Sequence, residues 1–75
     1  MPKTPSSAFA CKVLLRHDFQ FVKQKGSHAK YRKDGTPSLT VIVPMGRKNL
    51  RLGTFHSIVL QAGLSEEDFL GKRAA

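Results

Sequence analysis

The pattern of apolar and polar positions predicts a helix near the N-terminus of the chain. Apolar residues recur there at spacings of three and four, which is typical of a helix with one buried face: Phe9, Ala10, Val13 and Leu14. The preceding stretch TPSS, residues 4–7, offers hydroxyl side chains that can cap a helix and a proline that the first turn tolerates. The helical pattern ends over residues 16–18.

Three strands are predicted next, because the helical repeat gives way to runs of aromatic and β-branched residues. These runs are FQFVKQK at 19–25, HAKYRK at 28–33 and LTVIV at 39–43, the last stopped by Pro44. A hairpin-type turn at Gly26-Ser27 joins the first two runs, and DGTP at 34–37 marks a second turn. Two consecutive hairpins predict an antiparallel sheet.

A second helix is predicted after the strands, with Thr54 as its cap and Gly63 at its end. Its apolar positions would form one buried face: Phe55, Ile58, Val59 and Ala62. The stretch SEED at 65–68 is similar to a capping box with Asp in place of the usual Glu. It predicts a short last helix that buries Phe69 and Leu70.

This order of elements predicts an α+β fold, α-β-β-β-α, with a three-stranded antiparallel sheet and both main helices on one of its faces. The other face of the sheet would be open to solvent. A chain of 75 residues forms one domain, residues 1–75, with a modest core. We expect residues 1–5 and 71–75 to be frayed.

The charge of the chain indicates a polyanionic partner. Thirteen Lys and Arg residues stand against five Asp and Glu, for a net charge of +8. Neutralised phosphates release counterions, so nucleic acid is the first candidate, ahead of a membrane surface or an acidic protein. The single cysteine, Cys11, is interpreted as a buried structural thiol. The N-terminus lacks the apolar core of a signal peptide, so we expect a cytoplasmic protein with no membrane association.

The hairpin predicts where the basic residues lie. If Gly26-Ser27 is a two-residue turn, Lys25 pairs with His28 and strand alternation gathers one histidine and several cations on one face. These residues are Lys23, Lys25, His28, Lys30 and Arg32. Phe19 and Phe21 would fall on that face too. A bulge near Val22 would switch their side, or the rings could sit beyond the sheet edge or stack on a base.

Several stretches together resemble the HicA family of bacterial toxins. They are GSH at 26–28, Pro44 closing the third strand, GT at 53–54 and QAGLS at 61–65, in an order that covers Leu14 to about Leu70. The family consists of small messenger-RNA-cleaving proteins with a fold like a double-stranded-RNA-binding domain. The chain departs from it at Asp18, where the family usually has Gly. It also has Met45, not histidine, after the proline.

The resemblance implies that His28 is catalytic. It also implies a HicB-type antitoxin partner and growth inhibition when that partner is absent. We expect messenger RNA to contact a basic surface that includes the turn and the connection after the third strand: Lys23, Lys25, Gly26, Ser27, Lys30, Arg32, Arg47 and Lys48.

The chemistry of RNA cleavage agrees with this set of residues. RNA carries its own nucleophile, the 2′-OH, so an enzyme must supply proton transfer and cations for the phosphorane charge. Histidine, whose ordinary pKa is near 6.5, can act as acid or base at neutral pH, and Lys and Arg supply the charge. We expect no metal and no small-molecule cofactor. His17 and His56 are weaker candidates for a second catalytic group.

Three alternatives to a catalytic toxin are open from the sequence. A non-catalytic double-stranded-RNA-binding module would bind without cleavage, but such modules usually have a basic start to the second helix, and GTFHS at 53–57 has none. A small structural RNA-binding protein would show no turnover and no dependence on His28. An inactive toxin relative would also fail to cleave.

Overall fold

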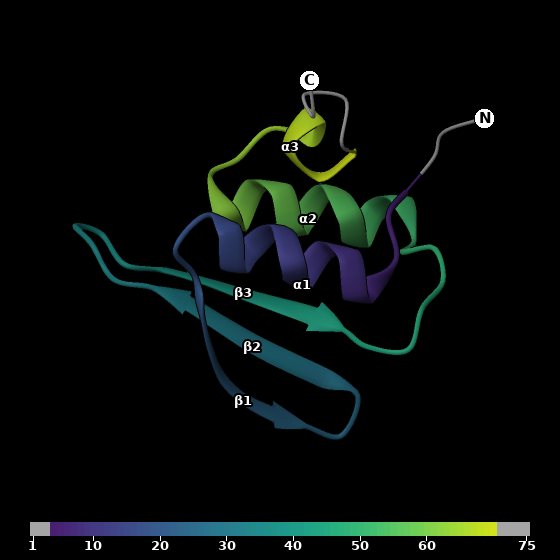
Figure 1. Cartoon of the computed structure of the whole chain (residues 1–75), viewed down its shortest axis with the longest axis horizontal. Coiled ribbons are helices and arrows are strands. Elements are labelled where there is room, and N and C mark those ends of the chain that lie inside the picture. Colours follow the sequence, from purple (N-terminus) through teal and green to yellow (C-terminus); the bar gives the residue numbers. More distant parts are fainter. Residues whose placement is uncertain (1–3, 71–75) are drawn as a thin grey trace.

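In the computed structural model, which describes residues 4–70, one helix precedes a three-stranded sheet along the chain and two helices follow it. The elements are α1 (Ser7–Arg16), β1 (Gln20–Lys25), β2 (His28–Lys33), β3 (Leu39–Pro44), α2 (Leu52–Ala62) and α3 (Glu66–Leu70) (Figure 1). The strands are antiparallel and lie in the order β1-β2-β3. The predicted α+β fold is confirmed.

A bulge in β1 places the aromatic residues on the helix side of the sheet. Phe21 pairs with Tyr31 and Lys23 pairs with Lys30, so the register shifts across Val22. The Phe21 and Tyr31 rings meet edge to face, with their centroids 5.7 Å apart. Phe19, just before the strand, is buried. Of the three arrangements open from the sequence, the bulge is the one found.

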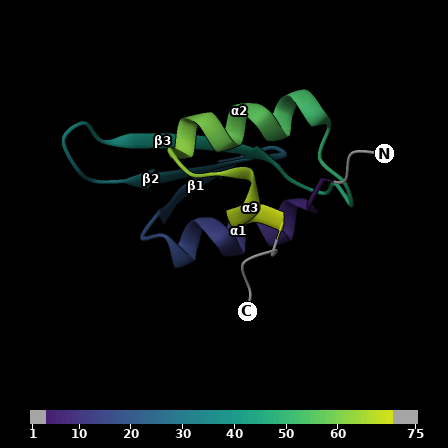
Figure 2. The same ribbon diagram turned by 90° about the horizontal axis from the view of Figure 1, so that it is seen from above.

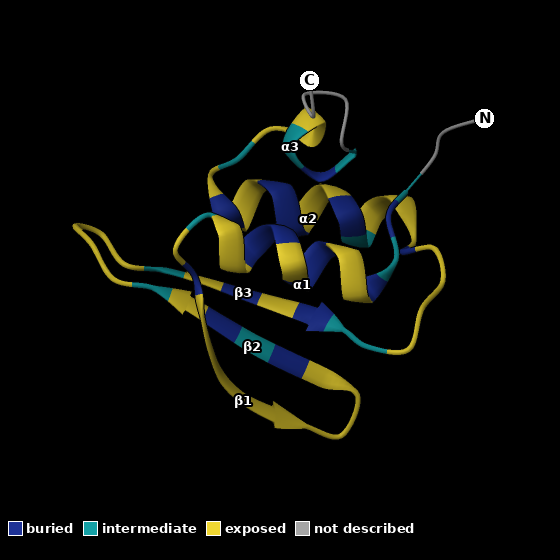
Figure 3. Cartoon of the chain, in the orientation of Figure 1, coloured by how far each residue is buried: buried dark blue, intermediate teal, exposed yellow. Residues whose placement is uncertain are grey.

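The core lies between one face of the sheet and the helices. The buried residues of β2 and β3 on that face alternate with exposed or half-buried ones (Figure 3): Ala29, Tyr31, Val41 and Val43. The helices contribute most of the rest: Ala10, Val13, Leu14, Phe55, Ile58, Val59, Ala62 and Phe69. Every residue of β1 is exposed, because the helices leave this edge strand uncovered.

Local hydrogen bonds explain where each helix begins and ends. Ser6 caps α1 by accepting the Phe9 N–H at 3.0 Å, as the hydroxyl pattern predicts. Gly63 ends α2 with a φ of 68°, the left-handed conformation that glycine adopts without strain. The prediction that Thr54 caps α2 is wrong. The helix begins at Leu52 with Arg51 as its cap residue, and the Arg51 side chain makes no cap hydrogen bond.

The segments before α1 and at α3 are fixed by hydrogen bonds. Thr4 Oγ1 donates to Leu50 O at 2.5 Å, and Leu50 N–H donates to Pro5 O at 2.9 Å. Our expectation of fraying is therefore wrong for residues 4 and 5, and residues 1–3 and 71–75 lie outside the described part.

The capping box predicted at the start of α3 forms, with the Asp68 carboxylate as its acceptor. Both the N–H and the hydroxyl of Ser65 donate to the Asp68 carboxylate at 3.0 Å. Helix α3 lies against both α1 and α2 (Figure 2). Its Phe69 ring meets Phe55 edge to face at 5.9 Å, so the last helix closes one side of the core.

Candidate nucleic-acid interface

His28 is the first residue of β2 and is exposed to solvent. It follows a two-residue turn in which Gly26 has a φ of 59°, a conformation that favours glycine. The register pairs His28 with Lys25 on β1 and with Pro44 on β3. The pairing with Lys25 is the one expected from the sequence, so the imidazole stands on the sheet surface with a lysine beside it.

The helix-free side of the sheet gathers the predicted cations around His28. We call this side the open face; its residues are Gln20, Lys23, Lys25, His28, Lys30, Arg32, Thr40, Ile42 and Pro44. The residues between them on β2, Ala29 and Tyr31, point into the core, which confirms the predicted alternation. Arg32 also forms an exposed ion pair with Asp34 at 3.2 Å.

A buried serine fixes the loop that leaves the open face. Ser7 is 1% exposed, and its hydroxyl donates to Pro44 O at 2.5 Å and accepts the Arg47 N–H at 3.1 Å. Its own N–H donates to Arg47 O at 2.9 Å. Met45, which directly follows Pro44, donates its N–H to Ser27 O at 2.6 Å. The first turn of α1, the loop and the Gly26-Ser27 turn are thus held together.

Arg47 and Lys48 project from this loop and are exposed. The loop, the β1–β2 turn and the first turns of α1 and α2 all lie at one end of the molecule (Figure 1). Helix N-termini carry partial positive charge, so both helices add to the cationic character of this end. The structure therefore brings Arg47 and Lys48 to the end of the sheet that carries His28.

Neither of the other histidines joins His28 on the open face. His17 is the C-cap residue of α1, and its N–H donates to Val13 O and Leu14 O. His56 lies on α2, where its Nε2 is 2.9 Å from Glu66 Oε2 of α3. Both belong to the helix layer, so the described residues place a single histidine on the open face.

Behind β2, Cys11 and Tyr31 form a buried polar contact. Burial raises the pKa of the Cys11 thiol, and the Tyr31 hydroxyl partly offsets that effect. Burial, with the neighbouring Cys11, raises the pKa of Tyr31 to about 12. The Cys11 Sγ also lies 3.6 Å from Met45 Sδ. Both groups stay protonated at neutral pH and serve as core, as expected for Cys11.

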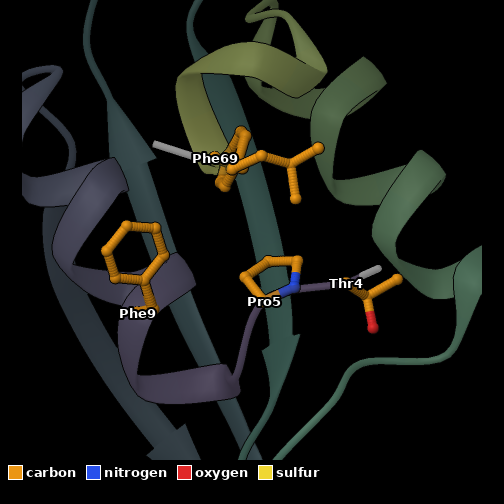
Figure 4. Close-up of a pocket in the computed structure, with 5 residues that line it drawn as sticks. Thr4, Pro5, Phe9 and Phe69 are labelled. Carbon is orange, nitrogen blue, oxygen red and sulfur yellow. The ribbon is translucent and has the colours of Figure 1, made fainter. Parts of the chain in front are cut away.

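Two pockets lined by described residues lie away from the open face. One, of about 160 Å³, is lined by Thr4, Pro5, Phe9, Phe69 and Leu70 (Figure 4). It has no ionisable side chain in its lining. Another is lined by His56, Val59, Leu60 and Glu66.

Within 4–70, no three His, Cys, Asp or Glu side chains are grouped so that they could hold a metal ion. In the same part of the chain, no helix combines the length and apolar character needed to cross a membrane.

Two residues of this region were not singled out by sequence reasoning. The sequence indicates Ser7 only as a helix start signal, because its partners are 37 and 40 positions away. It indicates Ile42 only as part of a strong strand, although the pairing of Ile42 with Lys30 puts it on the open face, 40% exposed. The alternation that placed Lys30 would have placed Ile42 as well.

Comparisons with known proteins agree with the resemblance drawn from the sequence. A family model described as the HicA toxin of bacterial toxin–antitoxin systems matches residues 10–64. This match covers α1 from residue 10 onward, the whole sheet and α2, and includes His28 and the loop after β3. No curated protein matches the chain.

Proposed function

This chain belongs to the HicA toxin family of bacterial toxin–antitoxin systems, and from that premise we propose that it is an endoribonuclease that cleaves messenger RNA. Membership of the family implies an antitoxin partner. We further propose that this partner is of the HicB type, that His28 is the catalytic residue, and that cleavage arrests growth when the antitoxin is absent.

The proposed reaction uses the RNA 2′-OH as nucleophile. His28 takes the proton of that hydroxyl or protonates the leaving 5′-oxygen, and Lys25 and Lys30 stabilise the charge on the phosphorane. The reaction assigns no role to a metal, because the nucleophile is already part of the substrate. The second proton-transfer group is Lys25, Lys30, a group of the substrate or water.

The observation that carries the proposal is the position of His28. It is exposed, flanked by Lys25 across the hairpin, and set at the end of the sheet to which Arg47 and Lys48 are brought. A histidine that served only the fold would be expected to pack or to form a hydrogen bond. A catalytic one must be open to a strand of RNA.

The sequence argument against a non-catalytic RNA-binding module is weaker in the structure. Because α2 begins at Leu52, its cap residue is the basic Arg51. The start of this helix is therefore less neutral than the sequence indicated. Binding alone does not separate the two functions, so the test must measure cleavage.

The function is tested by expression in bacteria without an antitoxin gene. We expect wild type to arrest growth and His28→Ala to permit it at equal protein level, because only the first has the proton-transfer group. The purified wild type should cut end-labelled single-stranded RNA in the presence of a chelator. A folded wild type that cuts no RNA with or without added divalent metal would contradict the proposal.

A further inference from the structure

The open face is divided lengthwise by charge. Its β1 and β2 side carries the cations Lys23, Lys25, Lys30 and Arg32 with His28. Its β3 side carries only uncharged residues: Thr40, Ile42 and Pro44. Ile42 lies in the middle of that side and exposes 40% of its surface, so the apolar centre of the face stands beside its cations.

The face is also divided crosswise into three rows of paired residues. They are Lys25, His28 and Pro44; then Lys23, Lys30 and Ile42; then Gln20, Arg32 and Thr40. Successive rows are about 7 Å apart, because an antiparallel strand rises about 3.4 Å per residue. This spacing is close to that of successive phosphates along an extended RNA strand.

We propose that a single RNA strand lies along β2, with its phosphates over the β1 and β2 cations and a base against Ile42. The scissile phosphate lies at the row of His28, and the next phosphate lies at the row of Lys30. The base of the nucleotide between these two phosphates then reaches the β3 side at Ile42. This placement rests on the proposed function.

A single strand fits this face better than a duplex does. The bases of a duplex are paired and stacked inside it, whereas those of a single strand can turn an apolar surface toward a side chain. A contact through the base surface favours no particular base, because every base has such a surface. The third row contributes less, because Arg32 is already paired with Asp34.

The placement is tested with a DNA oligonucleotide that contains one ribonucleotide. Cleavage needs a 2′-OH, so the scissile phosphate is then known. Removing the base of the nucleotide between the first two rows should slow wild-type cleavage about threefold to tenfold, less than the loss of an aromatic stacking contact. Ile42→Ala and Ile42→Thr should slow cleavage of the intact oligonucleotide to a similar extent. In the Ile42 variants, removing this base should not slow cleavage any further.

A matched control is Leu60→Ala, which removes an 80% exposed side chain from α2 and should leave every rate unchanged. The affinity for 2′-O-methyl RNA, which cannot be cleaved, is measured in parallel. Affinity that depends on Ile42 without any cleavage would support the placement and overturn the proposed catalysis. Cleavage that is equally sensitive to base removal in wild type and Ile42→Ala would overturn the placement and leave the catalysis standing.

Discussion

At the scale of single residues, Asp18 is held in a conformation that aspartate adopts at a cost. Its φ is 72°, in the left-handed region just after the cap of α1, and its N–H donates to Leu15 O. The resemblance drawn from the sequence implies glycine at this position. Asp tolerates this region better than most residues, so the turn can form with Asp in place of Gly.

The turn at Asp18 therefore offers a stabilising substitution. Asp18→Gly should raise the free energy of unfolding by about 0.5 kcal/mol, because relief of strain exceeds the added freedom of the unfolded chain. Asp18→Ala should lower it by about 1 kcal/mol. Urea denaturation measures both. Equal stability of the Gly and Ala variants would show that the left-handed conformation imposes no strain.

At the scale of elements, the hairpin could be predicted because its signals are local. Gly26-Ser27 set the turn, the turn set the pairing of Lys25 with His28, and alternation then set the open face. The start of α2 could not be predicted this way. Thr54 is a good cap by type, but the segment 49–50 is tied to Thr4 and Pro5, and the helix begins at Leu52.

The contact of α1 with the loop after β3 is the long-range feature that sequence reasoning missed. No local sequence pattern predicts that Ser7 contacts Pro44 and Arg47, because these residues are distant in the chain. The bonds matter for function if they hold Arg47 and Lys48 where RNA passes. Ser7 would then be a positioning residue.

This role predicts that Ser7→Ala weakens RNA binding through the loop. The unfolding free energy should fall by about 1 to 3 kcal/mol, since two partners lose their hydrogen bond. Affinity for 2′-O-methyl RNA should fall as well. In an Arg47→Ala, Lys48→Ala background, Ser7→Ala should cause no further loss of affinity.

Ser6→Ala is the control for Ser7→Ala. It removes the α1 cap and costs about 1 kcal/mol without touching the loop, so its RNA affinity should match that of wild type. If Ser6→Ala and Ser7→Ala weaken binding equally, or if the loss persists without Arg47 and Lys48, Ser7 acts on stability alone.

At the scale of the whole molecule, opposite charges are separated. The helix α3 holds three of the five acidic residues in its first turn, Glu66, Glu67 and Asp68, where the helix dipole favours them. The net charge of +8 is therefore uneven, with the cations of the open face and of the loop at residues 47 and 48 left largely uncompensated. This arrangement would direct RNA toward the sheet.

Salt dependence measures how many of these cations meet phosphate. For single-stranded RNA we expect the logarithm of the association constant to fall with the logarithm of salt concentration with a slope of about −3 to −4, at roughly 0.7 per contact. Lys30→Ala should reduce the magnitude of the slope by about 0.7. Lys12→Ala, on the exposed side of α1, should leave it unchanged. Equal slopes for both variants would place the RNA elsewhere.

The central claim is that His28 performs proton transfer in RNA cleavage. Its most direct test is the single-turnover cleavage rate of purified wild type, His28→Ala and the control His17→Ala on the oligonucleotide with one ribonucleotide. We predict that His28→Ala cleaves at least about a hundredfold more slowly than wild type, because a general acid or base usually contributes that much to the rate. Its affinity for 2′-O-methyl RNA should stay near that of wild type. His17→Ala should cleave like wild type. A folded His28→Ala protein that cleaves at the wild-type rate would contradict the claim.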